Sequence, residues 1–166
     1  MQGFCEQVAP TNLEELSAVT SIFRPGPLSA GVDEDYVKTK RGLKKPKYEH
    51  PILKEVLEKN YGFIIYQEDL AKIAHRMGKD ITLTEGNKLR KLLTKQGTGA
   101  AGSEKAKIHD KFIVGCVEKG MANSAAEKLW QKMEYFSGYG FNASHAYSYS
   151  IISYQCAYLF AYYAPE

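Results

Sequence analysis

The chain is 166 residues long, 44% of them hydrophobic and 25% charged, with a formal net charge of +3. These proportions are those of an ordinary globular domain and exclude an intrinsically disordered chain. No run approaches the roughly 18 uninterrupted apolar residues of a transmembrane helix, and the N-terminus does not resemble a signal peptide. We therefore expect a cytoplasmic protein without membrane contact. Reduced thiols are predicted for the three widely spaced cysteines, Cys5, Cys116 and Cys156.

Residues 1–10 are predicted to be an incoming connection, followed by a helix over residues 11–22. The segment Arg24-Pro25-Gly26-Pro27 ends that helix, because two prolines around a glycine cannot continue it. Arg24 is therefore predicted to lie on a stiff turn. There it either meets a phosphate or an acidic partner, or it is an ordinary exposed loop arginine.

Two basic segments, residues 38–47 and 88–95, contain several lysines and arginines and no acidic residue. The first overlaps the end of a predicted helix over residues 31–42 and leads to a helix that begins at Pro51. Both segments are candidate contacts for nucleic-acid phosphates, and the alternative is a solvated charged surface. The residues that we assign to DNA contact are Lys38, Lys40, Arg41, Lys44, Lys45 and Lys88.

An extended segment over residues 61–65 is predicted to lead into a helix from Tyr66 to Met77. Glu68 and Asp69 lie in its first turn, where acidic side chains stabilise the helix dipole. Because these two residues are adjacent rather than three or four apart, they do not form a shared metal-binding face. No metal site is expected here.

The pair Thr82 and Glu85 forms a capping-box pattern that begins a helix extending to Lys95. Leucines line one face of this helix, whereas Lys88, Lys91 and Lys95 line another. Aligned ammonium groups repel one another unless a polyanion lies across them. This face therefore suits a triphosphate or a nucleic-acid backbone.

The next segments predict a glycine-rich loop over residues 96–102, a helix over residues 103–119 and a helix that is capped by Ser124. Trp130 is assigned to core or inter-domain packing. The whole pattern predicts an all-α fold of about seven or eight helices packed as one unit.

The last segment begins with the glycines at 138 and 140 and contains no helix breaker until Pro165. Either Asn142 or Ser144 is expected to cap a helix of about five turns. Apolar and aromatic side chains occupy most of its circumference, which predicts burial on more than one face.

The head of this last helix is polar. Asn142, Ser144, His145 and Ser148 gather in its first turns, beside the positive end of the helix dipole, where an anion or a nucleotide is favoured. Neighbouring tyrosine rings are able to stack on a base. The alternative is a core helix that happens to contain many tyrosines.

Four motifs occur in the same order in a known family. They are Arg-Pro-Gly-Pro at 24–27, Tyr-Gly-x-x-x-Tyr-Gln-Glu at 61–68, Gly-Tyr-Gly-Phe-Asn-x-Ser-His-Ala-x-x-Tyr at 138–149 and Tyr-Gln-x-Ala-Tyr-Leu at 154–159. Together they resemble the fingers of C-family replicative DNA polymerases, the bacterial DNA polymerase III alpha subunit. The resemblance covers nearly the whole chain. It implies an edge of the palm or a connection at residues 1–23 and a fingers domain at residues 24–166.

In that family the fingers close over the incoming deoxynucleoside triphosphate and position it against the primer end. The resemblance implies phosphate contact by Arg24, Arg90, Lys91 and Lys95. It implies contact with the nucleotide or the nascent base pair by Asn142, Ser144, His145 and Tyr149. The family has an Arg-Arg pair where this chain has Arg90-Lys91, and lysine lacks the bidentate fork of arginine.

Polymerisation is expected to use Mg²⁺, which arrives with the triphosphate and is held mainly by palm carboxylates. The palm motif with paired aspartates is absent from this sequence, so we expect no polymerisation by the chain alone. The implied partners are primer-template DNA, deoxynucleoside triphosphates, the palm and thumb of the polymerase and other replication proteins. The alternatives are a stand-alone helical nucleic-acid-binding module without catalysis and a structural scaffold.

Overall fold

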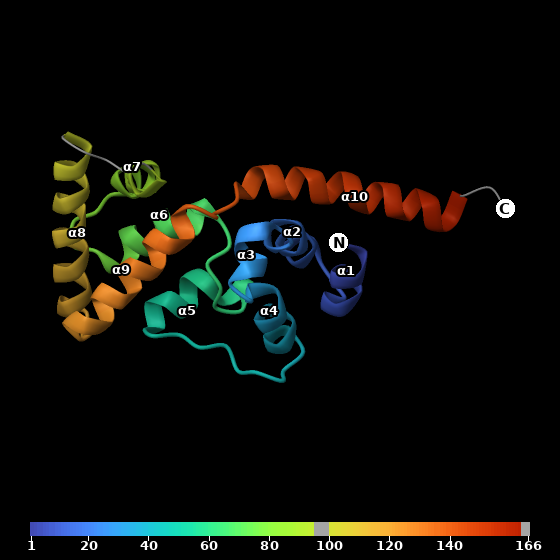
Figure 1. Cartoon of the computed structure of the whole chain (residues 1–166), viewed down its shortest axis with the longest axis horizontal. Helices are drawn as coiled ribbons and strands as arrows, with labels where there is room; N and C mark the ends of the chain where they lie inside the picture. The colour runs from blue at the N-terminus through green and yellow to red at the C-terminus, as the bar shows by residue number, and fades with distance from the viewer. Residues whose placement is uncertain (95–99, 164–166) are drawn as a thin grey trace. The chain divides into compact units, whose positions relative to one another are not determined.

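The computed structural model describes residues 1–94 and 100–163. Ten α-helices and no β-strand occur in these ranges, which confirms the predicted all-α class. The helices form two compact units (Figure 1). Unit 1 consists of Met1–Lys45 and Phe141–Glu166, and unit 2 consists of Pro46–Gly140. The predicted division of residues 1–23 from residues 24–166 stays a prediction.

Unit 1 combines four short helices from the beginning of the chain with the long helix from its end. These helices are α1 (Gln2–Val8), α2 (Leu13–Ile22), α3 (Pro25–Ser29), α4 (Val32–Lys40) and α10 (Ala143–Tyr163). Helix α10 lies along α2 (Figure 1), and α1 packs against both α2 and α4. The apolar core of this unit includes Val8, Ile22 and Tyr36, each of which is almost fully buried.

The sequence analysis did not predict α1 and α3. The prolines do end α2 at Ile22, as expected, but they also begin α3. Pro25 occupies the first helical position, where a missing N–H removes no intrahelical hydrogen bond and the fixed φ angle suits a helix. Arg24 is thus the N-cap residue of a short helix rather than part of an irregular turn.

Unit 2 contains five helices and a short 3-10 turn. They are α5 (Pro51–Leu57), the 3-10 turn (Glu58–Asn60), α6 (Gln67–Met77), α7 (Leu83–Thr94), α8 (Ala100–Glu118) and α9 (Asn123–Ser137). Helix α8 begins earlier than the expected residue 103. Of the loop predicted over residues 96–102, residues 96–99 lie outside the described residues.

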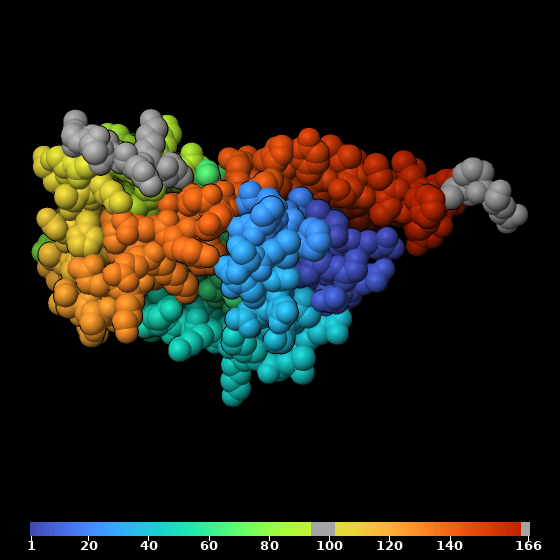
Figure 2. Space-filling view, in the orientation of Figure 1, coloured from blue at the N-terminus to red at the C-terminus, as the bar shows by residue number. Residues whose placement is uncertain are grey.

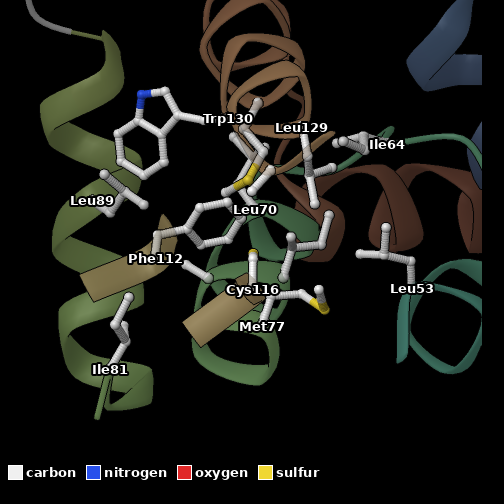
Figure 3. Packing of buried hydrophobic residues seen from close by; sticks show 14 of the residues in the cluster. Leu53, Ile64, Leu70, Met77, Ile81, Leu89, Phe112, Cys116, Leu129 and Trp130 are labelled. Atoms are coloured by element: carbon white, nitrogen blue, oxygen red, sulfur yellow. The ribbon is translucent and has the colours of Figure 1, made fainter. Parts of the chain in front are cut away.

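The core of unit 2 is formed by side chains from all five of its helices (Figure 3). The helical spacing of apolar residues between Tyr66 and Met77 predicts a buried stripe, and each member of that stripe is buried in the structure: Tyr66, Leu70, Ile73, Ala74 and Met77. Trp130 of α9 packs in this core against the ring of Phe112, with 5.4 Å between the ring centroids. Cys116 also lies in the core, where burial raises the pKa of its thiol to about 11. All three cysteines are free thiols, as predicted.

Helix α10 differs from the sequence prediction in its burial. Only Ala146 and Ser150 are buried, and every side chain from residue 151 to residue 163 is exposed. Figure 2 shows α10, in orange to red, on the surface of the face in view. The described part of this chain therefore does not itself supply the cover on more than one face that the sequence predicts for this helix. The small residues at 146 and 150 permit close packing, whereas the later tyrosines, isoleucines and phenylalanine remain on the surface. No helix among the described residues combines the length and hydropathy that crossing a bilayer requires.

Candidate nucleotide and nucleic-acid site

A row of aromatic rings marks the beginning of α10 in unit 1. Phe141 precedes the helix, and the centroid of its ring lies 5.6 Å from that of His145. The rings of His145 and Tyr149 follow at 4.6 Å. The three residues are spaced four apart, so a single helical face brings them into line. This row presents π-faces of the kind that stack on nucleobases.

Arg24 contacts this row from the other segment of unit 1, Met1–Lys45. Its guanidinium carbon lies 4.5 Å from the centre of the Phe141 ring, which is a cation–π contact. Its Nε donates a hydrogen bond to the carbonyl oxygen of Ser21 at 3.1 Å. Burial lowers the pKa of Arg24 below its usual value. Arg24 is therefore held in place by α2 and by Phe141.

Asn142 is the residue that caps α10, which resolves the alternative left by the sequence. The Asn142 Oδ1 atom accepts a hydrogen bond from the backbone N–H of His145 at 3.0 Å and another from the Ser144 hydroxyl at 2.6 Å. Ser144 and His145 are both exposed at this end of the helix. The structure thus brings five predicted residues together: Arg24, Asn142, Ser144, His145 and Tyr149.

Sequence reasoning missed Phe141, although this residue connects Arg24 to His145. Its spacing of four residues from His145, with Tyr149 four residues further, is a signal that the sequence does contain. Tyr149 also lines an apolar groove of about 790 Å³ in unit 1, together with residues of α1 and α2 that include Cys5 and Leu16.

The second group of predicted phosphate contacts lies on α7, in unit 2. The Arg90 Nη1 atom lies 3.6 Å from Oε1 of Glu68, at the beginning of α6. Lys91 is exposed, and Lys95 lies outside the described residues. The capping box that was predicted at the start of α7 is confirmed. The Thr82 N–H donates to Glu85 at 2.9 Å, and the Glu85 N–H donates to the Thr82 hydroxyl at 3.1 Å.

Acidic residues partly neutralise the basic face of α7. Lys88 pairs with Glu104 of α8 at 3.9 Å, while Arg90 pairs with Glu68. These acids belong to neighbouring helices, so the spacing of charges along α7 does not predict them. The mutual repulsion that we expected between the basic side chains is therefore weaker than the sequence suggests.

Asp69 lies in the first turn of α6, as predicted, and is a buried cap of that helix. Its Oδ2 atom accepts hydrogen bonds from the backbone N–H groups of Tyr66 at 2.9 Å and Ile65 at 3.2 Å, and from the Asn60 side chain at 3.1 Å. Burial raises the pKa of Asp69 to about 6, although the two backbone N–H groups act in the opposite direction. This cluster fixes the chain that enters α6.

The basic segment at residues 38–47 is largely engaged within unit 1. Lys40 forms a partly buried ion pair with Glu15 at 3.3 Å, and its Nζ donates to the carbonyl oxygen of Ala9 at 2.8 Å. The Arg41 Nε donates to the carbonyl oxygen of Gln7 at 2.8 Å. These two cations tie α4 to the end of α1, so a structural role accompanies any phosphate contact.

Other cations of the same segment remain on the surface. Lys38 pairs with Glu34 at 3.2 Å and Lys44 pairs with Asp35 at 2.7 Å, in both cases with exposed side chains. Lys45 is exposed as well. Exposed pairs of this kind exchange readily with solvent or with another anion. Assignment of these residues to DNA contact stays a prediction.

The chain matches the family model described as the bacterial DNA polymerase III alpha subunit finger domain over residues 1–120. It is 36% identical over 166 residues to DNA polymerase III subunit alpha of Aquifex aeolicus. It is 38% identical over 166 residues to the protein of that name from Borreliella burgdorferi, and 34% identical over 166 residues to that from Campylobacter jejuni. The chain spans 14%, 14% and 13% of the length of these relatives, respectively.

Proposed function

Because the chain belongs to the family of bacterial DNA polymerase III alpha subunit finger domains, we propose that it binds an incoming deoxynucleoside triphosphate. In this proposal it positions the nucleotide against primer-template DNA as part of a DNA-directed DNA polymerase. The observation that carries the proposal is the row formed by Arg24, Phe141, His145 and Tyr149 at the capped end of α10. The cation and the helix N-terminus suit a phosphate, and the row of tilted aromatic rings suits a base.

In this proposal Arg24, Arg90, Lys91 and Lys95 contact the phosphates of the nucleotide. The nucleoside lies near Asn142, Ser144, His145 and Tyr149. Arg90 has the fork that binds a phosphate with two hydrogen bonds, whereas Lys91 supplies a point charge. The exposed cations Lys38, Lys44, Lys45 and Lys88 contact the DNA backbone, and Lys40 and Arg41 contribute mainly by holding α4 to α1.

Mg²⁺ is the cofactor that such a polymerase is expected to use, and the described part of the chain contains no group of three or more His, Cys, Asp or Glu side chains that could hold a metal ion. We propose that the ion arrives with the triphosphate and is held by carboxylates of the palm. The palm, the thumb and other replication proteins are the proposed protein partners, and the cytoplasm is the proposed location. We expect that the chain alone does not extend a primer.

The test is the binding of fluorescent primed DNA, with and without the matching deoxynucleoside triphosphate. The wild-type chain and an Arg90→Ala, Lys91→Ala double variant are compared at two salt concentrations. The proposal predicts that the matching triphosphate tightens the wild-type complex and that the double variant loses this gain. Binding that depends only on salt, with no response to nucleotide, would mean either that the palm is needed to complete the pocket or that the chain is a helical nucleic-acid-binding module.

A further inference from the structure

The ion pair between Glu68 and Arg90 connects the first turn of α6 to the third turn of α7. The Glu68 Oε1 and Arg90 Nη1 atoms are 3.6 Å apart, and the two side chains are 33% and 24% exposed, respectively. Water therefore screens this pair less than it screens a fully exposed ion pair. The same guanidinium is the proposed phosphate contact, so a carboxylate lies beside the group that is proposed to bind a phosphate.

The backbone geometry holds both partners in place. Gly86 of α7 packs directly on α6, because a Cβ atom at this position would lie 2.6 Å from the carbonyl oxygen of Ala71. Arg90 follows Gly86 by one turn, and Glu68 precedes Ala71 by about one turn. The two contacts thus belong to one interface between antiparallel helices. Rotation or sliding of α7 is restricted at the point from which Arg90 extends.

Asp69, the residue next to Glu68, holds the first turn of α6 in place. Asp69 accepts hydrogen bonds from Asn60, Ile65 and Tyr66, which anchors the first turn of α6. The Glu68 backbone is therefore not free to withdraw. Exchange of partners at Arg90 then requires a change of the Glu68 side-chain conformation rather than a movement of α6.

From this geometry we infer that Glu68 is a resident counter-anion of Arg90, which an incoming phosphate displaces. The distance of 3.6 Å exceeds that of a good hydrogen bond, so the guanidinium keeps its donors for a bidentate contact with a phosphate. If Glu68 stayed beside Arg90, its carboxylate would repel the polyanion across a few ångströms. Glu68 therefore lowers the affinity of Arg90 for anions and favours a ligand that makes further contacts. This inference rests on the proposed role of Arg90 in phosphate binding.

An orienting role for Glu68 predicts the opposite result. If the carboxylate served to hold the guanidinium ready for phosphate, its removal would weaken anion binding. If Glu68 is a competing anion, its removal strengthens anion binding. The sign of the change therefore distinguishes the two roles.

The experiment measures binding of inorganic tripolyphosphate to the full chain by isothermal titration calorimetry at low salt. The variants are Glu68→Gln, Glu68→Ala and the matched control Glu55→Gln. Glu55 forms the other glutamate–arginine pair described in unit 2, with Arg76, so this control makes the same change of charge elsewhere. Each variant is first checked by thermal unfolding.

We expect both Glu68 variants to bind tripolyphosphate roughly tenfold more tightly, a change typical of the loss of one nearby like charge. The control should remain within about twofold of the wild type.

Two further results decide the interpretation. Adding Arg90→Ala to Glu68→Gln should remove the gain, because the two effects act at one site. An unchanged or weaker affinity of the Glu68 variants, or no tripolyphosphate binding by any variant, overturns the inference. If the proposed function is wrong but this inference is right, the result differs. A deoxynucleoside triphosphate would then bind no more tightly than tripolyphosphate, whereas Glu68→Gln would still bind tripolyphosphate more tightly than the wild type.

Discussion

The contact between α6 and α7 makes Gly86→Ala the most informative single substitution. The new methyl group would lie 2.6 Å from the carbonyl oxygen of Ala71 and 3.2 Å from its Cα, whereas ordinary van der Waals contact begins at 3.4 Å. The atoms that it meets belong to backbone, so a side-chain rotation does not relieve the overlap. The two helices have to separate by several tenths of an ångström.

Two energies compete in this variant. Alanine is more favourable than glycine inside a helix by about 1 kcal/mol. Overpacking of a closely fitted interface costs about 1–3 kcal/mol. Because the clash is with backbone, we place the cost near the upper end and expect Gly86→Ala to reduce the unfolding free energy by about 1–2 kcal/mol. For a chain of this size the melting temperature should fall by roughly 2–8 °C.

The assay is guanidinium unfolding followed by circular dichroism, with Gly3→Ala as the control. Gly3 lies in a helix too, but a Cβ atom at that position meets nothing within 4 Å. The control should therefore be neutral or slightly stabilising. A Gly86→Ala chain as stable as the wild type would refute the reasoning, because it would show that the interface accommodates the methyl group. Tripolyphosphate titration of the same variant then reports whether Arg90 has moved.

Three further predictions concern other parts of the chain. Because burial raises the pKa of Asp69 from 3.8 to about 6, the folded state binds this proton more tightly than the unfolded state. The contribution of Asp69 to the unfolding free energy should therefore fall by about 3 kcal/mol as the pH rises through that window. Asp69→Asn should lack this dependence in urea titrations at several pH values. Lys40→Ala removes the ion pair with the buried Glu15 carboxylate and should lower the unfolding free energy by about 2–4 kcal/mol in chemical unfolding. The control Lys38→Ala removes an exposed ion pair and should lower it by less than about 0.5 kcal/mol. Phe141→Leu should reduce the gain in DNA affinity from a matching nucleotide roughly fivefold, without changing the salt dependence of DNA binding in fluorescence titrations.

Local features of the fold were predictable because their causes lie within a few residues. The capping box of Thr82 and Glu85 and the buried stripe of α6 follow from spacing alone. Helix α3 was missed because Pro25 was interpreted as a helix breaker, although a proline in the first turn loses no hydrogen bond. The motif that begins at Gly138 also located the capped, aromatic end of α10 correctly.

Contacts between segments far apart in sequence could not be predicted in the same way. The partners of Lys40 and Arg41 come from the chain around α1 and α2, and the partner of Arg90 comes from α6. A basic run therefore looks more positive in the sequence than it is in the folded chain. The exposure of α10 is a similar case, because its composition indicates an apolar surface but does not say which element covers it.

The discontinuity of unit 1 has a consequence for synthesis on the ribosome. Helix α2 pairs with α10, which is translated roughly 120 residues later, or about 6–25 s at ordinary bacterial rates of elongation. Unit 2 is complete before α10 emerges, since all of its residues lie between the two parts of unit 1. Unit 2 is therefore expected to fold first, although it is second in the chain. During that interval the apolar side of α2 is a surface to which a chaperone has time to bind.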